Sequence, residues 1–410
     1  MSSVAREFFT VKRVSEARAG FLPAHRSGVE RVALGDAWGR VPAATILARA
    51  PLPGFDRSSV DGYAVRASDT FGASESIPGY LRVAGAVRIG AEADGQVAAG
   101  TTIAVPTGGM LPPGADAVVM IEHTLEALPG TIEVVRPAAP GENVVRSDED
   151  AAPGTPIALE GRPLRAQDLA MLAACGVVEL PVHVAPRVTI IATGDEVLPP
   201  NADVLPPGHV RDALSVSIGA LVREAGGDPR PAGIVRDDRH ALAHRLVRAV
   251  RESDLIVLCA GSSVGTRDQT AAAVAALEPS EIWCHGLAIK PGKPTLLASA
   301  GGIPIVGLPG NPRSALVVFR LIGTPLVRRI GGWTAEPRTG AVRATLARDL
   351  PSAAGRLDIV QVRLAGDRAQ PLFGPSALLS VLTAADGYLV IAEDATGLSA
   401  GEEVDVFPYA

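Results

Sequence analysis

The chain has 410 residues and a formal net charge of −6 at pH 7, and only 4% of its residues are aromatic. Nucleic-acid-binding proteins use basic surfaces and aromatic stacking platforms, so this composition argues against a nucleic-acid partner. No apolar run is long enough to cross a bilayer and the N-terminus lacks the apolar segment of a signal peptide, so we expect a cytoplasmic protein without membrane contact. A chain of this length is expected to form roughly two to four domains.

The cysteines and histidines show no catalytic or metal-binding spacing. Cys175, Cys259 and Cys284 form no CxxC pair, and we interpret them as small buried apolar residues. The chain has no HExxH motif, no Ser-His-Asp order that can be defended and no GxGxxG turn after a strand. The pattern therefore disfavours nucleophilic hydrolysis and nicotinamide chemistry.

The hydrophobic pattern of the N-terminal part of the chain changes twice. Residues 5–49 carry apolar residues at near-helical spacing and predict mainly helix. Residues 51–140 contain short apolar runs between Gly- and Pro-rich turns, which is typical of a β-rich domain. Helical periodicity returns in residues 162–175, with Gly176 as a C-terminal stop. The second helical segment could rejoin the first, which would make the β-rich part an insertion into a helical connecting domain.

From residue 186 apolar strands alternate with amphipathic helices, and the chain ends in short β runs over residues 338–410. The predicted strands are 187–193, 232–236, 254–260 and 303–309, and the predicted helices are 213–225, 238–252, 268–277 and 313–330. This alternation predicts a doubly wound, mostly parallel sheet covered on both faces, and the final part predicts a small barrel or sandwich. Open α/β sheets bind ligands at the carboxyl edge, where three of the strands end in Gly- or Ser-rich turns.

The first of these turns carries polar residues directly after a buried strand. Thr193, Gly194, Asp195 and Glu196 could order a ligand or hold a metal ion. They could equally form an ordinary turn with a helix-capping acid.

The turn that reads GSSVG predicts an anion site. Gly261 and Gly265 allow the backbone to approach a ligand, and Ser262 and Ser263 offer hydroxyl groups beside a helix start. Asp268 follows in the first helical turn, where it could share Mg²⁺ with a bound phosphate or simply complement the helix dipole.

The third turn leads into a helix through Gly310, Asn311 and Pro312. These residues could supply donors at the same edge, although Asn followed by Pro is also a common helix start. Two of the three lysines of the chain, Lys290 and Lys293, lie in the stiff turn IKPGKP. We interpret them as point charges for a phosphate or other oxyanion, against the alternative of a solvated turn.

Two further acidic residues lie outside the α/β part. Asp61 follows the motif FDRSSV in the β-rich part and precedes a Gly, so it could serve chemistry or form a plain turn. Asp150 ends the acidic stretch SDED, which favours a solvated loop over a site on sequence grounds alone.

Seven segments together resemble one family, molybdopterin molybdenumtransferase of molybdenum cofactor synthesis, which also forms the C-terminal domain of gephyrin. The segments are PLPGFDRSSVDGYAVR, LPPGADAVVMIE, GENVVRSDEDAAPG, IIATGDEV, GSSVGTRDQT, LAIKPGKP and GLPGNPRSAL. They occur in family order, and the resemblance extends over roughly residues 5–410.

The resemblance implies four domains and an elongated homodimer, with each site between domain III of one subunit and domain II of the other. The domains would be helical connecting domain I (1–50 with 141–183), β-rich domain II (51–140), α/β molybdopterin-binding domain III (184–333) and β-barrel domain IV (334–410). In such a dimer Asp61 of one subunit could join the turns of the other.

The implied reaction is insertion of molybdate into adenylylated molybdopterin with release of AMP, assisted by Mg²⁺ or a similar ion. By motif, the catalytic candidates are Asp61, Asp150, Glu196 and Asp268, of which Glu196 and Asp268 would also bind the metal. The substrate-binding candidates are Thr193, Gly194, Asp195, Gly261, Ser262, Ser263, Gly265, Lys290, Lys293, Pro309, Gly310, Asn311 and Pro312. The enzyme of the preceding step, a molybdopterin adenylyltransferase, is a possible partner.

Three alternatives compete with this interpretation. Enzymes that adenylylate molybdopterin resemble domain III alone, so the additional length of this chain favours the transferase. A gephyrin-like scaffold would not need the acidic residues and lysines that this chain retains. A non-catalytic protein that binds molybdate or molybdopterin stays open on sequence grounds.

Overall fold

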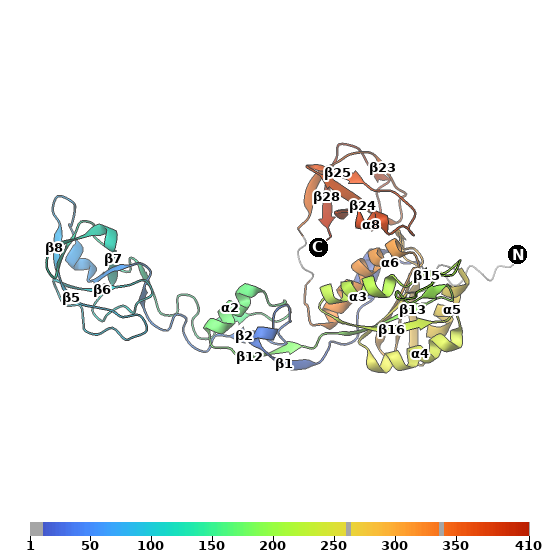
Figure 1. The fold of residues 1–410 in the computed structure, drawn as a ribbon, viewed down its shortest axis with the longest axis horizontal. Helices are drawn as coiled ribbons and strands as arrows, with labels where there is room; N and C mark the ends of the chain where they lie inside the picture. Colours follow the sequence, from blue (N-terminus) through green and yellow to red (C-terminus); the bar gives the residue numbers. More distant parts are fainter. Residues whose placement is uncertain (1–10, 260–263, 336–339, 410) are drawn as a thin grey trace.

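The structure is a computed structural model that describes residues 11–259, 264–335 and 340–409, with only the backbone described for residues 264–268. The molecule is elongated. A β-rich domain forms one end, a slender connecting region follows, and an α/β domain with a β-barrel beside it forms the other end (Figure 1). Among the described residues, no helix has the length and apolar character needed to span a membrane.

The β-rich domain contains one six-stranded sheet in the order β7-β4-β6-β5-β9-β8. Its strands are β7 (Ala117–Met120), β4 (Gly62–Val65), β6 (Thr101–Val105), β5 (Gly79–Ala86), β9 (Thr131–Val134) and β8 (Thr124–Leu128), with short helices η3 (Ala67–Thr70) and η4 (Ile121–His123). Successive residues alternate between two cores: Val65 and Val119 lie in one, and Ala64 and Val118 in the other. Apolar residues on both faces explain the weak polar alternation of these strands in the sequence.

The connecting region consists of chain segments from before and after the β-rich domain that pair with one another. β1 (Val29–Ala33) pairs with β12 (Glu179–His183), β2 (Ile46–Leu47) with β11 (Pro156–Ala158), and β3 (Arg57–Ser58) with β10 (Val144–Val145), all antiparallel. One helix, α2 (Ala166–Ala174), packs beside them. The β-rich domain is therefore an insertion between two segments that meet in space.

The prediction of mainly helix over residues 5–49 is wrong for most of the described part. After α1 (Val14–Gly20), the chain forms only the short helix η2 (Leu34–Asp36) and strands β1 and β2. The backbone of Val41 accepts a hydrogen bond from His183 N at 2.8 Å, so this stretch pairs its polar groups with a distant segment of the same chain and not along a helix. Helix α1 buries Val14 and Ala17 in the core of the α/β domain, so the one helix found lies outside the connecting region.

The α/β domain contains a six-stranded sheet in the order β16-β13-β17-β21-β20-β18. Its strands are β16 (Asp228–Val235), β13 (Arg187–Thr193), β17 (Leu255–Cys259), β21 (Ile303–Leu308), β20 (Leu296–Ala300) and β18 (Ser280–His285). The first four are parallel, as predicted, whereas β20 is antiparallel to both of its neighbours. β16 contains Pro229 and Pro231, which an edge strand tolerates.

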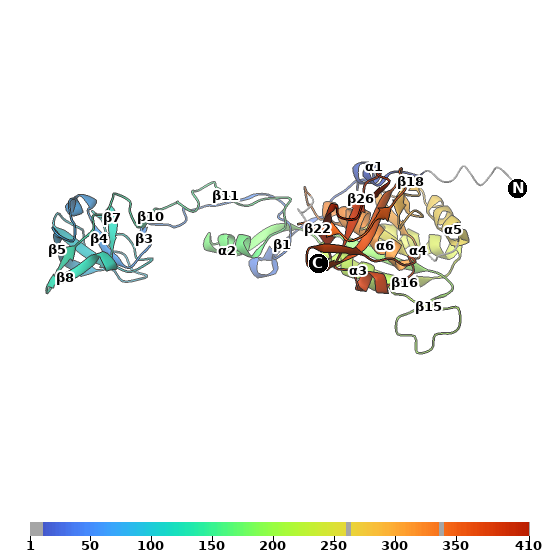
Figure 2. The same ribbon diagram turned by 90° about the horizontal axis from the view of Figure 1, so that it is seen from above.

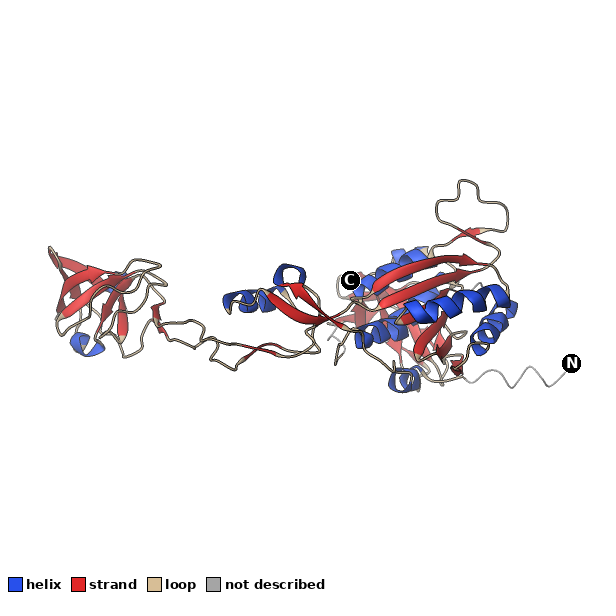
Figure 3. Ribbon diagram, turned by 90° about the horizontal axis from the view of Figure 1, so that it is seen from below, coloured by secondary structure: helices blue, strands red, loops and turns tan. Residues whose placement is uncertain are grey.

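Helices cover both faces of this sheet, which confirms the doubly wound prediction. The helices are α3 (Leu214–Glu224), α4 (Arg239–Glu252), α5 (Val264–Ala275), α6 (Pro312–Val318), the π-helical turn η5 (Phe319–Gly323) and α7 (Thr324–Ile330). One core joins Ile190 and Val257 to α3, α6 and α7, and the other joins Ile191 and Leu258 to α4 and α5. A long loop between β14 (Val197–Leu198) and β15 (Val210–Arg211) projects from this domain (Figures 2 and 3).

The C-terminal part is a closed five-stranded barrel, which confirms the barrel prediction. Its order is β24-β25-β22-β28-β26, and β26 returns to β24. The strands are β24 (Leu357–Ala365), β25 (Arg368–Pro371), β22 (Val342–Leu346), β28 (Glu403–Pro408) and β26 (Gly387–Ile391), accompanied by β23 (Leu350–Pro351), β27 (Gly397–Leu398) and helix α8 (Ser380–Thr383). β19 (Ile289–Lys290), which comes from the α/β domain, adds to β24 in parallel register and ties the two domains together.

Candidate functional site

The carboxyl edge of the α/β sheet holds a pocket of about 510 Å³. β13 is flanked in the sheet by β16, the next strand of the sheet along the chain, and by β17, the strand after that. The order of the strands therefore reverses direction between β13 and β17. Ligands of open α/β sheets bind in the crevice at such a reversal. The pocket is lined by the ends of β13 and β17, the β14–β15 loop, the start of α3, the turn before α6, and two barrel residues.

Thr193 and Glu196 both line this pocket, as the sequence predicted. Thr193 is 2% exposed, and its hydroxyl oxygen has no hydrogen-bond partner among the described residues. A side chain at Gly194 would have its Cβ 2.7 Å from an oxygen of Glu196, so only glycine lets this carboxylate lie against the backbone. An unpaired buried hydroxyl beside a half-buried carboxylate is suited to a polar ligand.

Asp195 lies outside the pocket lining. Its carboxylate is mostly exposed and accepts weak hydrogen bonds of 3.4 Å from Arg236 Nε and Asp237 N. Within this chain, Asp195 therefore contacts the loop after β16, and the structure does not bring it together with Thr193 and Glu196.

Asp212 also lines the pocket and was not among the predicted site residues. It is 9% exposed and accepts a hydrogen bond of 2.9 Å from Ser215 N at the start of α3. In the sequence, an acidic residue three positions before a Ser at a helix start is typical of a helix cap. This pattern therefore gave no sign that Asp212 could also bind a ligand. Burial and the charge of Asp212 raise the pKa of Cys259, so this pocket-lining thiol stays protonated and is no nucleophile.

Two carboxylates, Glu196 and Asp212, therefore lie in one pocket with the hydroxyl of Thr193. Within the described ranges, no group of three or more His, Cys, Asp or Glu side chains could hold a metal ion. Mg²⁺ does not require such a group, because it is commonly bound by one or two carboxylates together with water and substrate phosphates. The donors present thus fit Mg²⁺ with a phosphate-bearing ligand.

A second, larger cleft of about 670 Å³ lies between the α/β domain and the barrel. Four cationic side chains line it, namely Lys290, Lys293, Arg313 and Arg356, and no carboxylate is among its lining residues. The lysines are exposed, and neither has an ion-pair partner among the described residues. The predicted substrate-binding residue Pro309 lines the same cleft.

The barrel positions one side of this cleft. Lys290 lies opposite Asp358 in the β19–β24 pairing. Asp358 is 4% exposed and accepts hydrogen bonds from Arg356 Nε at 2.8 Å and Nη2 at 3.3 Å. This bidentate pair holds the Arg356 guanidinium in place at the cleft.

The two hollows meet at Asn311, which lines both, while Gly310 and Pro312 line only the smaller one. The two adjacent hollows thus offer an acidic part, with Glu196 and Asp212, and a cationic part. Such a division suits a ligand that carries several phosphate or oxyanion groups and a divalent cation.

Asp61 directly precedes β4 of the β-rich domain, and Asp150 lies between β10 and β11 of the connecting region. The β-rich domain is at the opposite end of the molecule from the α/β domain that holds this site (Figure 1). Asp61 is exposed, and its carboxylate accepts hydrogen bonds from Thr107 N at 2.8 Å and Thr107 Oγ1 at 3.1 Å. Asp150 is exposed as well. Gly261, Ser262 and Ser263 lie outside the described residues, and of Gly265 and Asp268 only the backbone, in α5, is described.

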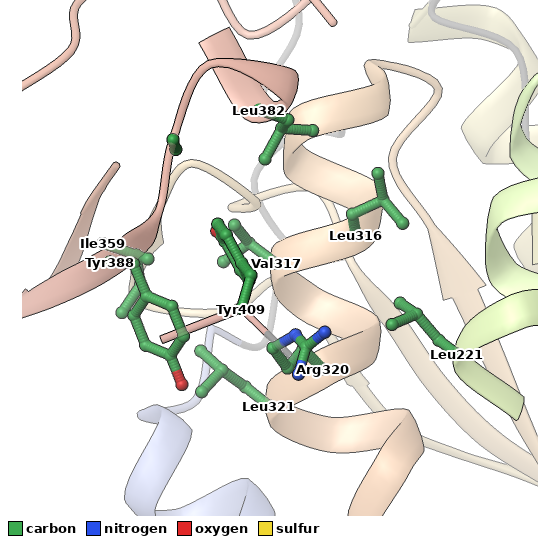
Figure 4. A pocket seen from close by; sticks show the side chains of 10 residues that line it. Leu221, Leu316, Val317, Arg320, Leu321, Ile359, Leu382, Tyr388 and Tyr409 are labelled. Atoms are coloured by element: carbon green, nitrogen blue, oxygen red, sulfur yellow. The ribbon is translucent and has the colours of Figure 1, made fainter. Parts of the chain in front are cut away.

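A third hollow, of about 210 Å³, lies between α6 and the barrel and is mainly apolar. Figure 4 shows Tyr388 and Tyr409 beside Leu316 and Leu321, with Arg320 at one side. Arg320 is paired with Glu224 at 3.0 Å, and burial raises the pKa of both tyrosines. With its only cation paired, this hollow lacks the converging polar groups of a catalytic site.

The fold is that of a multidomain α/β protein, and the lining of its two adjacent hollows suits an anionic ligand. Three family models match consecutive parts of the chain: MoeA N-terminal region (domain I and II) over residues 12–176, probable molybdopterin binding domain over 189–329, and MoeA C-terminal region (domain IV) over 343–409.

Full-length relatives agree with this match. The chain is 33% identical over 384 residues to molybdopterin molybdenumtransferase 2 of Mycobacterium tuberculosis, covering 92% of this chain and 94% of that protein. It is 30% identical to the molybdopterin molybdenumtransferase of Haemophilus influenzae, covering 93% and 94%. The crystal structure of the molybdopterin biosynthesis moeA protein from Pyrococcus horikoshii OT3 superposes with a TM-score of 0.86 at 32% identity, covering 98% and 100%.

The chain therefore belongs to the MoeA-type molybdopterin molybdenumtransferase family and is a transferase of molybdenum cofactor biosynthesis. The resemblance found in the sequence is confirmed.

Proposed function

We propose that this transferase inserts molybdate into the dithiolene of adenylylated molybdopterin and releases AMP, with a divalent ion such as Mg²⁺ assisting. The observation that supports this reaction most is the pair of adjacent hollows. A cleft with four cations and no carboxylate shares the lining residue Asn311 with a pocket that has two carboxylates. Molybdate is a dianion at neutral pH, and the substrate carries phosphate groups.

The cationic cleft would bind and orient the oxyanion. Lys290 and Lys293 bring ammonium groups from one turn, and Arg356 is held by Asp358. Preorganised cations lower the cost of bringing a dianion close to an anionic substrate, and they stabilise charge that develops when the phosphoanhydride is cleaved.

The acidic pocket would hold the nucleotide end of the substrate together with Mg²⁺. Glu196 and Asp212 are the described carboxylates that would bind the ion, and the expected third is Asp268. When bound, Mg²⁺ neutralises phosphate charge and acts as a Lewis acid on the cleaved phosphoanhydride. The unpaired hydroxyl of Thr193 would donate to the substrate. No protein nucleophile is needed, which agrees with the protonated state of Cys259.

The β-rich domain would complete the site of a second subunit in a homodimer. Asp61 is exposed, its orientation is set by Thr107, and the elongated chain keeps it away from the pocket of its own α/β domain. We propose the same for Asp150. The enzyme that adenylylates molybdopterin is the proposed source of the substrate and a possible partner.

The test is AMP release by the purified protein from adenylylated molybdopterin, measured with and without molybdate. The proposal expects release that depends on both protein and molybdate, and a loss of at least ~10-fold in Glu196→Gln. Glu252→Gln serves as the control because Glu252 is an exposed residue paired with Arg248 on α4. Release that is independent of molybdate would refute the proposed reaction.

A further inference from the structure

Among the four cations that line the cleft, Arg313 is half-buried and has no ion-pair partner among the described residues. Its Nε is fully buried and has no hydrogen-bond acceptor, and no ion pair is found for its side chain within the described ranges. Arg356, by comparison, is neutralised by Asp358, and the two lysines reach solvent. A buried guanidinium N–H without water or an acceptor costs free energy, and an anion that accepts from it offsets that cost.

The surroundings of Arg313 exclude an internal counterion. The lining residues of the cleft include three other cations and no acid. The ionisable group that acts on Arg313 is Tyr409, and burial raises the pKa of that phenol, so it carries no negative charge near neutral pH. The backbone of Arg313 donates to Ser376 O at 3.1 Å, which fixes the start of α6 against the barrel beside the cleft.

The differences in exposure separate two positions within the cleft. Lys290 and Lys293 are exposed, whereas Arg313, which lines the same cleft, is half-buried. A tetrahedral oxyanion occupies about the volume of four water molecules, or ~120 Å³. The cleft of about 670 Å³ is much larger, so the cations, and not the walls, must define where the oxyanion stays.

We infer that Arg313 is a further oxyanion-binding residue, which holds molybdate in the cleft and sets the affinity of the enzyme for it. This inference rests on the proposed function, because it takes the oxyanion to be the metallate substrate. The guanidinium provides a charge and a planar set of donors, whereas the lysines provide exposed point charges. No bond is formed or broken by Arg313.

The inference is tested by titrating the full-length protein with sodium molybdate in a calorimeter, without any pterin. The expected result for Arg313→Met is an affinity about 10–100-fold weaker, which corresponds to the loss of a charge-assisted hydrogen bond to an anion. Arg313→Lys keeps the charge and should recover part of this loss. Lys293→Met should also weaken binding, which verifies that the cleft is the site measured.

Arg320→Met is the matched control. Arg320 lies two turns further along the same helix, lines the apolar hollow and pairs with Glu224 (Figure 4). Arg320 is not among the residues that line the cleft, so its loss removes one positive charge from outside the site. Molybdate affinity should therefore stay within about twofold, since salt screens exposed charges that do not contact the ligand. Thermal unfolding of each variant separates a loss of binding from a loss of structure, and Arg313→Lys decides the case if Arg313→Met does not fold.

Unchanged molybdate affinity in Arg313→Met, while Lys293→Met binds weakly, overturns the inference and leaves the proposed function intact. Failure of the unaltered protein to bind molybdate also overturns it, because the cleft would then not be a preformed oxyanion site. In that second case, AMP release that still depends on molybdate would preserve the proposed function, and release without such dependence would remove both.

Discussion

Gly292 controls where Lys290 and Lys293 lie, and Gly292→Ala should damage both stability and oxyanion binding. Gly292 has φ +125°, a region that is essentially restricted to glycine, and an added Cβ would lie 2.5 Å from Val318 Cγ2 and 3.2 Å from Ile289 Cγ2. Backbone strain contributes about 1–3 kcal/mol. Overpacking against α6 adds about 1–3 kcal/mol. The α/β domain should therefore lose about 2–6 kcal/mol of unfolding free energy.

Gly302→Ala is the matched control. Gly302 also has positive φ, +80°, but no atom lies within 4 Å of an added Cβ. This variant pays only the left-handed strain, about 1–2 kcal/mol. A difference of about 2 kcal/mol between the variants corresponds to roughly 4–8 °C in thermal midpoint for a domain of this size.

Molybdate affinity provides the second measurement. Displacing the turn away from α6 moves both lysines, and the affinity of Gly292→Ala should fall by about 10-fold, equivalent to one weakened charge-assisted contact. Gly302→Ala should bind as the unaltered protein does. Equal thermal midpoints and equal affinities in the two variants would refute the reasoning, because the turn would then tolerate displacement and would not position the lysines.

Three further predictions concern other parts of the chain. Thr193→Val should leave the thermal midpoint unchanged or slightly higher, because the buried hydroxyl of Thr193 makes no hydrogen bond with the described residues. AMP release should nevertheless fall by about 10-fold. A loss of stability without a loss of activity would contradict this prediction. Asp212→Asn should raise the Mg²⁺ concentration needed for half-maximal AMP release by about 10-fold, whereas Asp238→Asn, which alters an equivalent cap at Ala241 N of α4, should not. Hydrogen bonds from Arg165 lower the pKa of Asp168 from 3.8 to about 2. Because the folded pKa is depressed, the ion pair stabilises α2 by about 1–2 kcal/mol above pH 4, and this advantage over Asp168→Asn should vanish as pH falls from 4 to 2 in unfolding experiments.

Local sequence signals determined much of the fold. The apolar runs 187–193 and 254–260 predicted parallel strands, because such strands are buried on both faces and need no polar alternation. The structure adds that β13 and β17 are neighbours in the sheet. The Pro-Gly turn and the Asn-Pro helix start were recognisable because Pro restricts φ whatever surrounds it. Asn311 does occupy the N-cap position, although its side chain makes no cap hydrogen bond. These same signals placed Thr193, Glu196, Lys290, Lys293 and Asn311 at the hollows that the structure contains.

Local sequence patterns predicted the wrong secondary structure where pairing with distant segments outweighs local conformational preference. The segment that contains Ile46 has helix-compatible spacing, yet it pairs with residues more than 100 positions later, because its backbone groups find partners in that distant segment of the same chain. The sequence analysis did not predict strands β18 and β20. They form an antiparallel pair between the predicted helix 268–277 and the predicted strand 303–309, and their apolar runs are short. Asp195 was grouped with its neighbours, but adjacent side chains in a turn point in different directions.

By itself, the sequence determined the family, the alternation of strands and helices, and the kinds of side chain expected at the site, namely carboxylates, hydroxyls and lysines. Only the tertiary structure decided that Asp212 joins Glu196, that Arg313 and Arg356 join the two lysines, and that Asp61 lies at the opposite end of its own chain. The physical reason is that a residue's conformation depends mainly on its neighbours in sequence, whereas its burial and partners depend on residues brought close by packing. The unpaired guanidinium of Arg313 becomes visible only when every surrounding acceptor has been placed.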